Sequence, residues 1–227
     1  MCGIIGVISR NEQSVVSDIL GGLGCLSSRG YDGAGIVVQQ GASFHLHKRE
    51  GKLVNLLNSL DENITGVCGI AHNRWATHGG ATDTNAHPHM SSDDSVVVVH
   101  NGILENYLSL KAALLRNGFH FQSDTDTEVI PNLIQQALED GAKSLVKAVM
   151  DIIPLLEGEY AFLVMSKKYP EEIVAATYER PLILGVSKDK YVVGSSEIAL
   201  VGLSDKVVEL GDNEVVSINA NSVSCYK

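Results

Sequence analysis

The chain opens with Met1-Cys2-Gly3-Ile4-Ile5-Gly6-Val7, and the interpretation of the whole sequence starts from this stretch. Removal of the initiator methionine would make Cys2 the first residue, with a thiol and a free α-amine on one residue. An α-amine titrates near pH ~8, so an appreciable fraction of it can accept a proton near neutrality. One residue can then supply both nucleophile and base, as an N-terminal threonine does in other hydrolases. A start codon followed by a small residue gives the same pattern, so this interpretation depends on a matching site elsewhere.

Composition restricts the classes of protein to consider. The 227 residues are 44% hydrophobic, enough to bury a full core as one large domain or two small ones. A net charge of -10 argues against a broad nucleic-acid or anionic-membrane surface. No apolar run approaches the roughly 20 residues of a membrane span, and no basic stretch precedes the apolar N-terminus as in a secretory signal. The four cysteines are scattered without a CxxC pair, which favours reduced thiols in the cytoplasm: Cys2, Cys25, Cys68 and Cys225.

The spacing of apolar residues predicts a layered α+β domain. Short uncharged runs predict buried strands over residues 2–8 and 95–100, and a strand pair over 35–38 and 43–47. Helical spacing predicts helices over 15–26, 105–116, 128–139 and 143–156. We expect the second and third helices to end at the left-handed glycines Gly118 and Gly141, and residues 124–127 to cap the third. Further short strands are predicted at 161–165, 173–176, 182–186, 191–193, 206–210 and 214–218.

Three short stretches contain more polar residues than packing requires. The first runs over 71–80, includes the only tryptophan, and has the form of a strand leading into a glycine-containing loop. The second is His100-Asn101-Gly102, where an amide and a backbone N–H at the end of a rigid strand could donate to a developing oxyanion. The third, over 123–128, is a polar loop that opens a helix. Each has an ordinary explanation by itself: Asn-Gly is a frequent turn and acidic residues cap helices. Their combination is what points to a site.

In this combination the chain resembles class II glutamine amidotransferase domains, and within them the glutaminase half of glutamine–fructose-6-phosphate aminotransferase. The resemblance rests on six motifs in order, beginning with Cys-Gly-Ile at residues 2–4. The other five are Arg29-Gly30-Tyr31-Asp32, Arg74-Trp75-Ala76-Thr77-His78-Gly79, Asn85-Ala86-His87-Pro88-His89, His100-Asn101-Gly102-Ile103 and Thr125-Asp126-Thr127-Glu128.

The resemblance implies an N-terminal-nucleophile hydrolase fold, an αββα sandwich of four layers with two antiparallel sheets between helical layers. It also implies the reacting groups. Cys2 would attack the side-chain amide of glutamine and form a γ-glutamyl thioester, while its own α-amine relays the proton to the departing ammonia. Asn101 and Gly102 would form the oxyanion hole.

The resemblance further implies how free glutamine is bound. Arg74 would bind the α-carboxylate and Asp126 the α-ammonium, while Thr77 and His78 complete the pocket and Trp75 lies near the exit taken by ammonia. These roles make physical sense, because a zwitterionic substrate needs one fixed cation and one fixed anion, and the planar fork of arginine suits a carboxylate.

The implied function is therefore hydrolysis of L-glutamine to glutamate and ammonia by a single domain over residues 2–227. In a complete synthase, a sugar-phosphate isomerase domain of the same enzyme would use the ammonia to make glucosamine 6-phosphate from fructose 6-phosphate. That region is absent from this chain, which is either an excised domain or a free-standing glutaminase. No cofactor, nucleic acid or membrane is implied.

Two other interpretations stay open. One is a metal site, because five histidines fall close together in the sequence, although no HExxH motif accompanies them: His72, His78, His87, His89 and His100. The other is a glutamine-sensing or regulatory module without turnover. Retention of Met1 would favour the second, because an acylated Cys2 nitrogen cannot act as a base.

Overall fold

Two antiparallel sheets form the centre of the computed structural model, which describes residues 2–227. The first sheet has seven strands, in the order β11 (Lys206–Glu209), β9 (Ile183–Val186), β10 (Lys190–Gly194), β1 (Gly3–Ser9), β4 (Cys68–Arg74), β2 (Gly33–Gln40) and β3 (Ser43–Glu50). The second has six, in the order β13 (Val223–Tyr226), β12 (Val215–Asn219), β8 (Glu172–Tyr178), β7 (Gly158–Ser166), β6 (Val96–Leu104) and β5 (His89–Met90).

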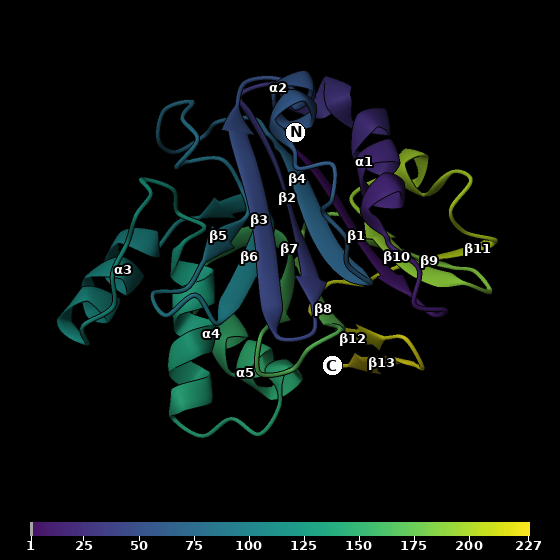
Figure 1. The fold of residues 1–227 in the computed structure, drawn as a ribbon. Helices are drawn as coiled ribbons and strands as arrows, with labels where there is room; N and C mark the ends of the chain where they lie inside the picture. The colour runs from purple at the N-terminus through teal and green to yellow at the C-terminus, as the bar shows by residue number, and fades with distance from the viewer. Residues whose placement is uncertain (1) are drawn as a thin grey trace.

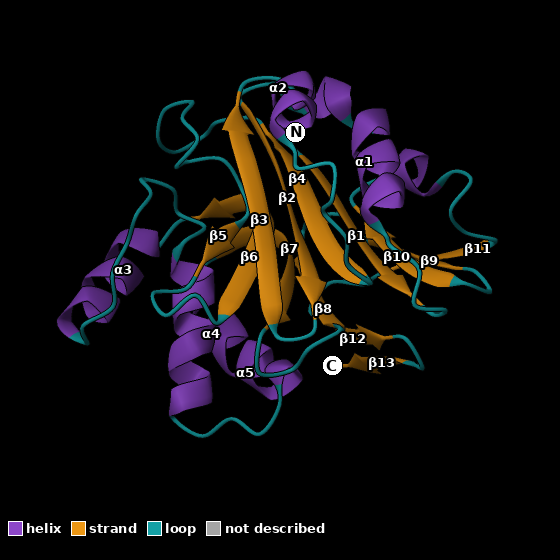
Figure 2. Ribbon diagram, in the orientation of Figure 1, coloured by secondary structure: helices purple, strands orange, loops and turns teal. Residues whose placement is uncertain are grey.

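Helices cover the outer face of each sheet. The first sheet is covered by α1 (Val16–Cys25) and α2 (Leu53–Ser59), at the top of Figure 1. The second is covered by α4 (Val129–Glu139) and α5 (Leu145–Ile152), at the bottom, and α3 (Tyr107–Arg116) packs against α4. Figure 2 shows the strands enclosed between these helices. Short 3-10 helices complete the structure: η1 (Ser27–Arg29), η2 (Ile153–Leu155) and η3 (Glu197–Leu200).

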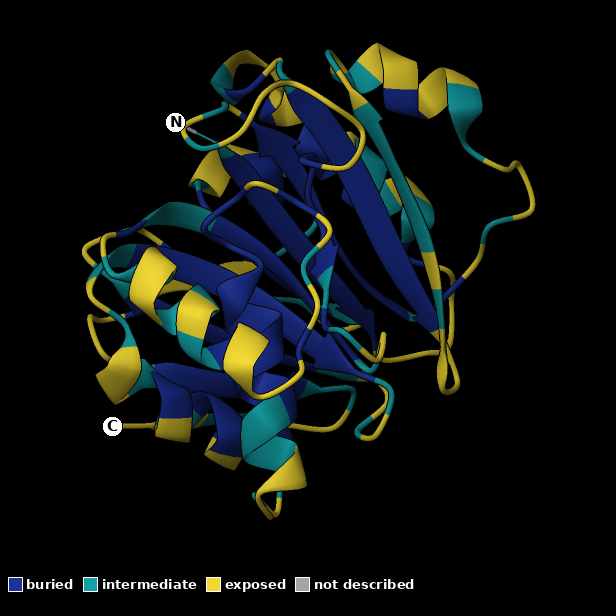
Figure 3. Ribbon diagram, turned by 90° about the vertical axis from the view of Figure 1, so that its left-hand side faces the viewer, coloured by how far each residue is buried: buried dark blue, intermediate teal, exposed yellow. Residues whose placement is uncertain are grey.

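The valine run of β6 shows how the sequence specifies the layers. Successive side chains of a strand point to opposite faces, so Val97 and Val99 enter the core between the sheets while Val96 and Val98 enter the core beneath α4 and α5. A third core lies between the first sheet and α1 and α2. Three cores separate four layers, which confirms the predicted αββα sandwich; in Figure 3 the inner strands of the sheets are buried, whereas edge strands such as β3 are partly exposed.

Most predicted elements are present, and one predicted helix and one predicted cap differ from the structure. Gly118 and Gly141 adopt φ of +88° and +107°, as expected after α3 and α4. The predicted helix over 143–156 ends at Ile152 and continues as a 3-10 turn, because Pro154 has no N–H to donate. The prediction that residues 124–127 cap α4 is wrong: no side chain caps that helix. Among the described residues, no helix is long and apolar enough to cross a membrane.

The register of the central strands places the start of β1 beside the end of β4. Gly3 pairs with Asn73, so Cys2 lies next to Arg74 and Trp75. Ser195, just after β10, holds β1 from the other side: its N–H donates to the Ile4 carbonyl at 3.0 Å, and its Oγ accepts from the Ile4 N–H at 3.0 Å. The position of Cys2 is therefore fixed by both neighbouring strands.

Candidate active site

A cavity of about 230 Å³ lies at the end of the sandwich where β1 begins and β4 and β6 carry their polar residues. It collects residues from both sheets and from the loops that follow β4 and precede α4. All eight side chains or backbone groups that the sequence singled out lie on its wall: Cys2, Arg74, Trp75, Thr77, His78, Asn101, Gly102 and Asp126.

The Cys2 thiol is held against the backbone of Trp75. The Trp75 N–H donates to Sγ at 3.1 Å, and Sγ lies 3.4 Å from the Trp75 carbonyl oxygen. Burial raises the pKa of the Cys2 thiol, whereas the Trp75 N–H and the positive charge of Arg74 act in the opposite direction by stabilising the thiolate. The net direction is upward, so burial disfavours the thiolate that attack by Cys2 needs.

Asn101 and Gly102 lie in the second half of β6, which continues to Leu104, and their geometry is restricted. The Asn101 amide is held at both ends: Nδ2 donates to the Cys2 carbonyl at 3.1 Å, and Oδ1 lies 3.0 Å from His72 Nε2. Gly102 adopts φ +135°, and a Cβ there would lie 2.0 Å from the Glu159 carbonyl oxygen. Only glycine fits this position, and Gly102 lines the cavity.

A cation and an anion line the same cavity. The buried Arg74 guanidinium donates to a turn of carbonyls over 78–80, with Nη1 2.9 Å from the Gly80 oxygen and Nη2 3.2 Å from the Gly79 oxygen. Nη2 also donates to the His78 carbonyl. Asp126 is buried and accepts from the Leu104 N–H at 2.9 Å. These backbone contacts fix both charges.

The remaining predicted residues lie toward the mouth of the cavity. Trp75 is 44% exposed and contacts Tyr31, which is 49% exposed, with ring centroids 5.1 Å apart. Thr77 is exposed, while His78 is half-buried and its Nδ1 lies 3.9 Å from an Asp126 carboxylate oxygen. The exposed rings of Trp75 and Tyr31 therefore lie next to the polar interior of the cavity.

Four buried histidines, called here the histidine cluster, gather at the cavity: His72, His87 and His100 line its wall, and His89 lies off it. The His72 and His87 rings stack at 4.1 Å, and His89 meets His87 edge-on at 4.6 Å. Burial lowers the pKa of each imidazole, that of His72 to about 3, so the cluster is uncharged near neutral pH. Within residues 2–227, no group of three or more histidine, cysteine or acidic side chains is arranged to hold a metal ion.

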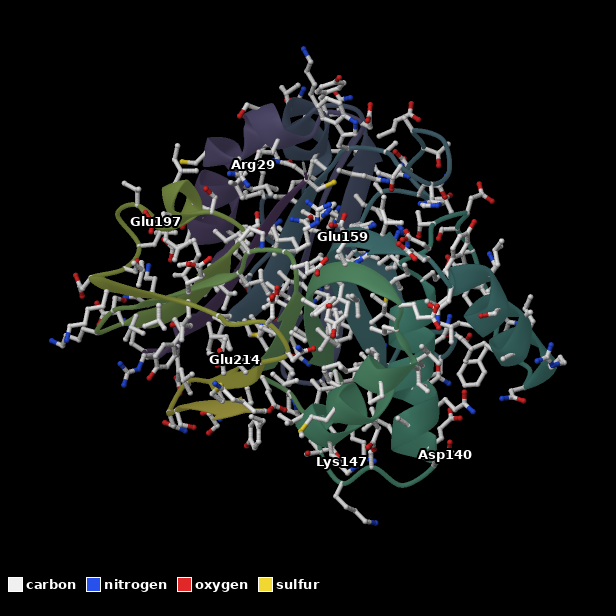
Figure 4. The ribbon with its side chains drawn as sticks, turned by 180° about the vertical axis from the view of Figure 1, so that it is seen from behind. Arg29, Asp140, Lys147, Glu159, Glu197 and Glu214 are labelled. Carbon is white, nitrogen blue, oxygen red and sulfur yellow. The ribbon has the colours of Figure 1, made fainter. Side chains whose placement is uncertain are left out.

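Sequence reasoning did not single out several residues of the cavity wall. Arg29 was part of a quoted motif without a role, and the wall also includes Arg180, Pro181 and Ser195. Arg180 pairs with Glu159 of β7. In the view from behind, Arg29 and Glu159 come from different layers at the same end of the sandwich (Figure 4). Nothing local in the sequence marks the last three, because strand pairing brings them from the other end of the chain.

Comparison with known proteins identifies the family. The glutamine amidotransferase domain model matches residues 72–202, more than half of the chain. The chain belongs to this family. Among curated relatives, the glutamine–fructose-6-phosphate aminotransferases (isomerizing) of Clostridium acetobutylicum and Idiomarina loihiensis are 41% and 42% identical to it. Both alignments cover 100% of this chain but only 36% and 37% of the relatives, so the chain spans little more than a third of their length.

Solved structures support the same assignment. The glutamine phosphoribosylpyrophosphate amidotransferase of B. subtilis, solved with ADP and GMP, matches with a TM-score of 0.86 and 29% identity. The match covers 100% of this chain and 49% of that one. A glutamine aminotransferase class-II domain protein from Silicibacter pomeroyi shares the fold at a TM-score of 0.64 and 14% identity. The class II resemblance and the N-terminal-nucleophile hydrolase type of sandwich are thus confirmed.

Proposed function

We propose that residues 2–227 form one glutaminase domain that hydrolyses L-glutamine to glutamate and ammonia through a γ-glutamyl thioester on Cys2. One observation carries this proposal: a single cavity is lined by a thiol, an amide donor, the buried cation Arg74 and the buried anion Asp126. Free glutamine presents the complementary groups, an amide carbon to be attacked, a carbonyl oxygen, a carboxylate and an ammonium.

The reaction begins when the α-amine of processed Cys2 accepts the thiol proton and Sγ attacks the side-chain amide carbon. A C–S bond forms and the carbonyl electron pair moves to oxygen. The C–N bond then breaks, and the nitrogen leaves as ammonia with the proton from the α-ammonium. Water attacks the thioester next, which releases glutamate and restores the thiol. Met1, whose removal the first step requires, lies outside the described residues.

The other site residues act on substrate charge. The Asn101 amide and the Gly102 N–H would donate to the oxyanion, which bears more negative charge than the ground-state carbonyl. Arg74 would pair with the α-carboxylate and Asp126 with the α-ammonium, while Thr77 and His78 close the pocket around them. Trp75 would lie beside the path by which ammonia leaves.

We further propose that the ammonia serves synthesis of glucosamine 6-phosphate from fructose 6-phosphate in the cytoplasm. The partner would be a sugar-phosphate isomerase domain of the same full-length enzyme. This step rests on the names of the relatives, about 40% identical over the whole of this chain. Growth of a strain lacking its own synthase on medium without amino sugars, after fusion of this chain to such a domain, would test it.

The first experiment measures glutamate release from L-glutamine by protein whose intact mass shows that Met1 is absent. Cys2→Ala is the control. We expect release by the processed protein and none by the variant. Tight binding of glutamine by folded, processed protein without release would favour a sensing module instead. Equal release by both proteins would remove Cys2 from the mechanism.

A further inference from the structure

We propose that His72 is a positioning residue, which holds the Asn101 amide so that its free N–H points at the oxyanion. This inference rests on the proposed function of Asn101 and adds a residue to which neither the motifs nor that proposal gives a task. His72 lies in β4 of the first sheet and Asn101 in β6 of the second. Their contact therefore joins the two sheets directly behind the nucleophile.

The Cys2 backbone decides which way the Asn101 amide faces. The carbonyl oxygen of Cys2 can only accept a hydrogen bond, so the amide atom 3.1 Å away must be the nitrogen. The reversed amide would bring two oxygens together without a proton. The orientation of Asn101 thus follows from the backbone of the nucleophile itself.

The amide orientation in turn decides the tautomer of His72. With Nδ2 toward Cys2, Oδ1 faces His72 Nε2 at 3.0 Å, and an amide oxygen accepts only. Nε2 must therefore carry the proton. Nδ1 is buried without a close hydrogen bond among the described residues, and the His72 ring also lies near the His100 backbone, so the Asn101 contact is what decides the tautomer.

This arrangement leaves one N–H of Asn101 for substrate. An amide nitrogen has two hydrogens, of which one is used on the Cys2 carbonyl. His72 is fully buried and stacked on His87 at 4.1 Å, which restricts its ring and, through the Oδ1 contact, the orientation of the Asn101 amide. Fixed donors stabilise an oxyanion without the cost of reorganising during the reaction.

Kinetics of His72 variants test the inference. His72→Phe keeps a ring of similar size but removes the donor, whereas the side-chain amide nitrogen of His72→Gln can restore it. We expect His72→Phe to lower kcat by roughly 10-fold or more, less than loss of an oxyanion donor itself, with little change in KM. His72→Gln should recover most of kcat. The matched control is His89→Phe, which removes a histidine of the same cluster that contacts Thr125 and lies off the cavity wall.

A purely structural role predicts different results. It would lower kcat as much in His89→Phe as in His72→Phe, or leave His72→Gln no better than His72→Phe, and either result would overturn the inference. A double-mutant cycle adds a second criterion. If His72 acts through Asn101, His72→Phe should have little further effect on kcat in an Asn101→Ala background. If His72→Phe lowered kcat just as much in the Asn101→Ala background, the positioning role would be refuted, while the oxyanion role of Asn101 would still stand.

The tautomer provides a readout that does not depend on turnover. Nitrogen-15 spectra of the processed protein at neutral pH should show His72 neutral with its proton on Nε2. A proton on Nδ1, or a charged ring, would contradict the inference even if catalysis by Cys2 were established. Unchanged kcat in Asn101→Ala would instead refute the oxyanion assignment, and the inference with it.

Discussion

Arg74 has two tasks that compete for the same atoms. Its guanidinium nitrogens already donate to the carbonyls of the turn over 78–80, and the proposed reaction asks the same group to bind a carboxylate. A guanidinium carries five N–H donors in a rigid fork, so it can do both, whereas an ammonium has three donors on one atom.

We therefore expect Arg74→Lys to raise KM for glutamine by roughly 10- to 100-fold, the range for losing a hydrogen bond to a charged group. The change in kcat should be smaller. Steady-state kinetics over a wide glutamine range would measure both. Unaltered glutamine binding by the variant would count against the carboxylate assignment.

Asn101 should show the opposite kinetic pattern. Its donor matters most when charge develops on the substrate oxygen, so Asn101→Ala should lower kcat by ~10²–10³ with a much smaller change in KM. The same kinetic assay measures this, with thermal unfolding as a check on folding. A change confined to KM would remove Asn101 from the oxyanion role.

At the scale of elements, Gly102 couples the site to the sheet. It pairs with Tyr160 across β6 and β7, and a Cβ would lie 2.0 Å from the Glu159 carbonyl oxygen. Gly102→Ala must therefore move one strand away from the other in addition to accepting a strained φ. We expect the free energy of unfolding to fall by about 1–3 kcal/mol or more, and turnover to be lost. Urea unfolding would measure the first effect and glutamate release the second.

Gly21 provides the matched control for that substitution. It is an exposed glycine inside α1, and a Cβ there would meet nothing within 4 Å. Gly21→Ala should raise the free energy of unfolding by about 0.5–1 kcal/mol, because alanine loses less conformational freedom in a helix. If Gly102→Ala changed the free energy of unfolding as little as Gly21→Ala does, the close approach of Gly102 to the Glu159 carbonyl would not control stability.

Sequence patterns predict a strand well when all of its buried residues are apolar. They are less informative where a strand buries polar residues that line the cavity. The valine run of β6 was readable because every residue is apolar. In β4 the buried strand continues through His72, Asn73 and Arg74, so the sequence does not show where the strand ends. The short helix α2 and the strand β13 were not predicted at all. The polar loop before α4 suggested a cap, but Asp126 is used on the Leu104 N–H instead.

The candidate site was predictable because its motifs are short and contiguous, whereas the support behind it is not local. Ile4 and Ser195 are 191 positions apart and meet only because β10 pairs with β1. Likewise His72 meets Asn101 only because the two sheets pack face to face. Periodicity indicates which residues are buried, but it does not order the strands, so such partners become visible only in the assembled fold.

At the scale of the whole molecule, the histidine cluster makes folding sensitive to acid. In the unfolded chain each imidazole has the ordinary pKa of 6.5, whereas burial lowers the pKa of all four in the folded protein. The unfolded state therefore binds more protons below this value, so the cluster's contribution to stability is complete above pH 6.5 and falls as pH decreases.

The size of this effect follows from proton linkage. Consider a histidine that stays neutral in the folded state but becomes charged in the unfolded state as the pH falls from about 7.5 to about 5.5. Each such histidine lowers the free energy of unfolding by about 1.4 kcal/mol, so His72, His87 and His89 together lower it by about 4 kcal/mol. His100 acts in the same direction. Ordinary carboxylates titrate near pH about 4, below this window. A loss of this size is a large part of the roughly 5–15 kcal/mol that stabilises most domains.

Urea unfolding at these two pH values would measure the loss directly. His89→Phe should reduce the pH-dependent difference by about 1.4 kcal/mol, the share of one histidine, whatever it does to stability at the higher pH. His120→Gln is the control, because His120 is exposed in the folded protein and should leave the difference unchanged. A difference of equal size in all three proteins would mean that His89 is protonated at the lower pH in the folded state as in the unfolded state, and that it contributes nothing to acid unfolding.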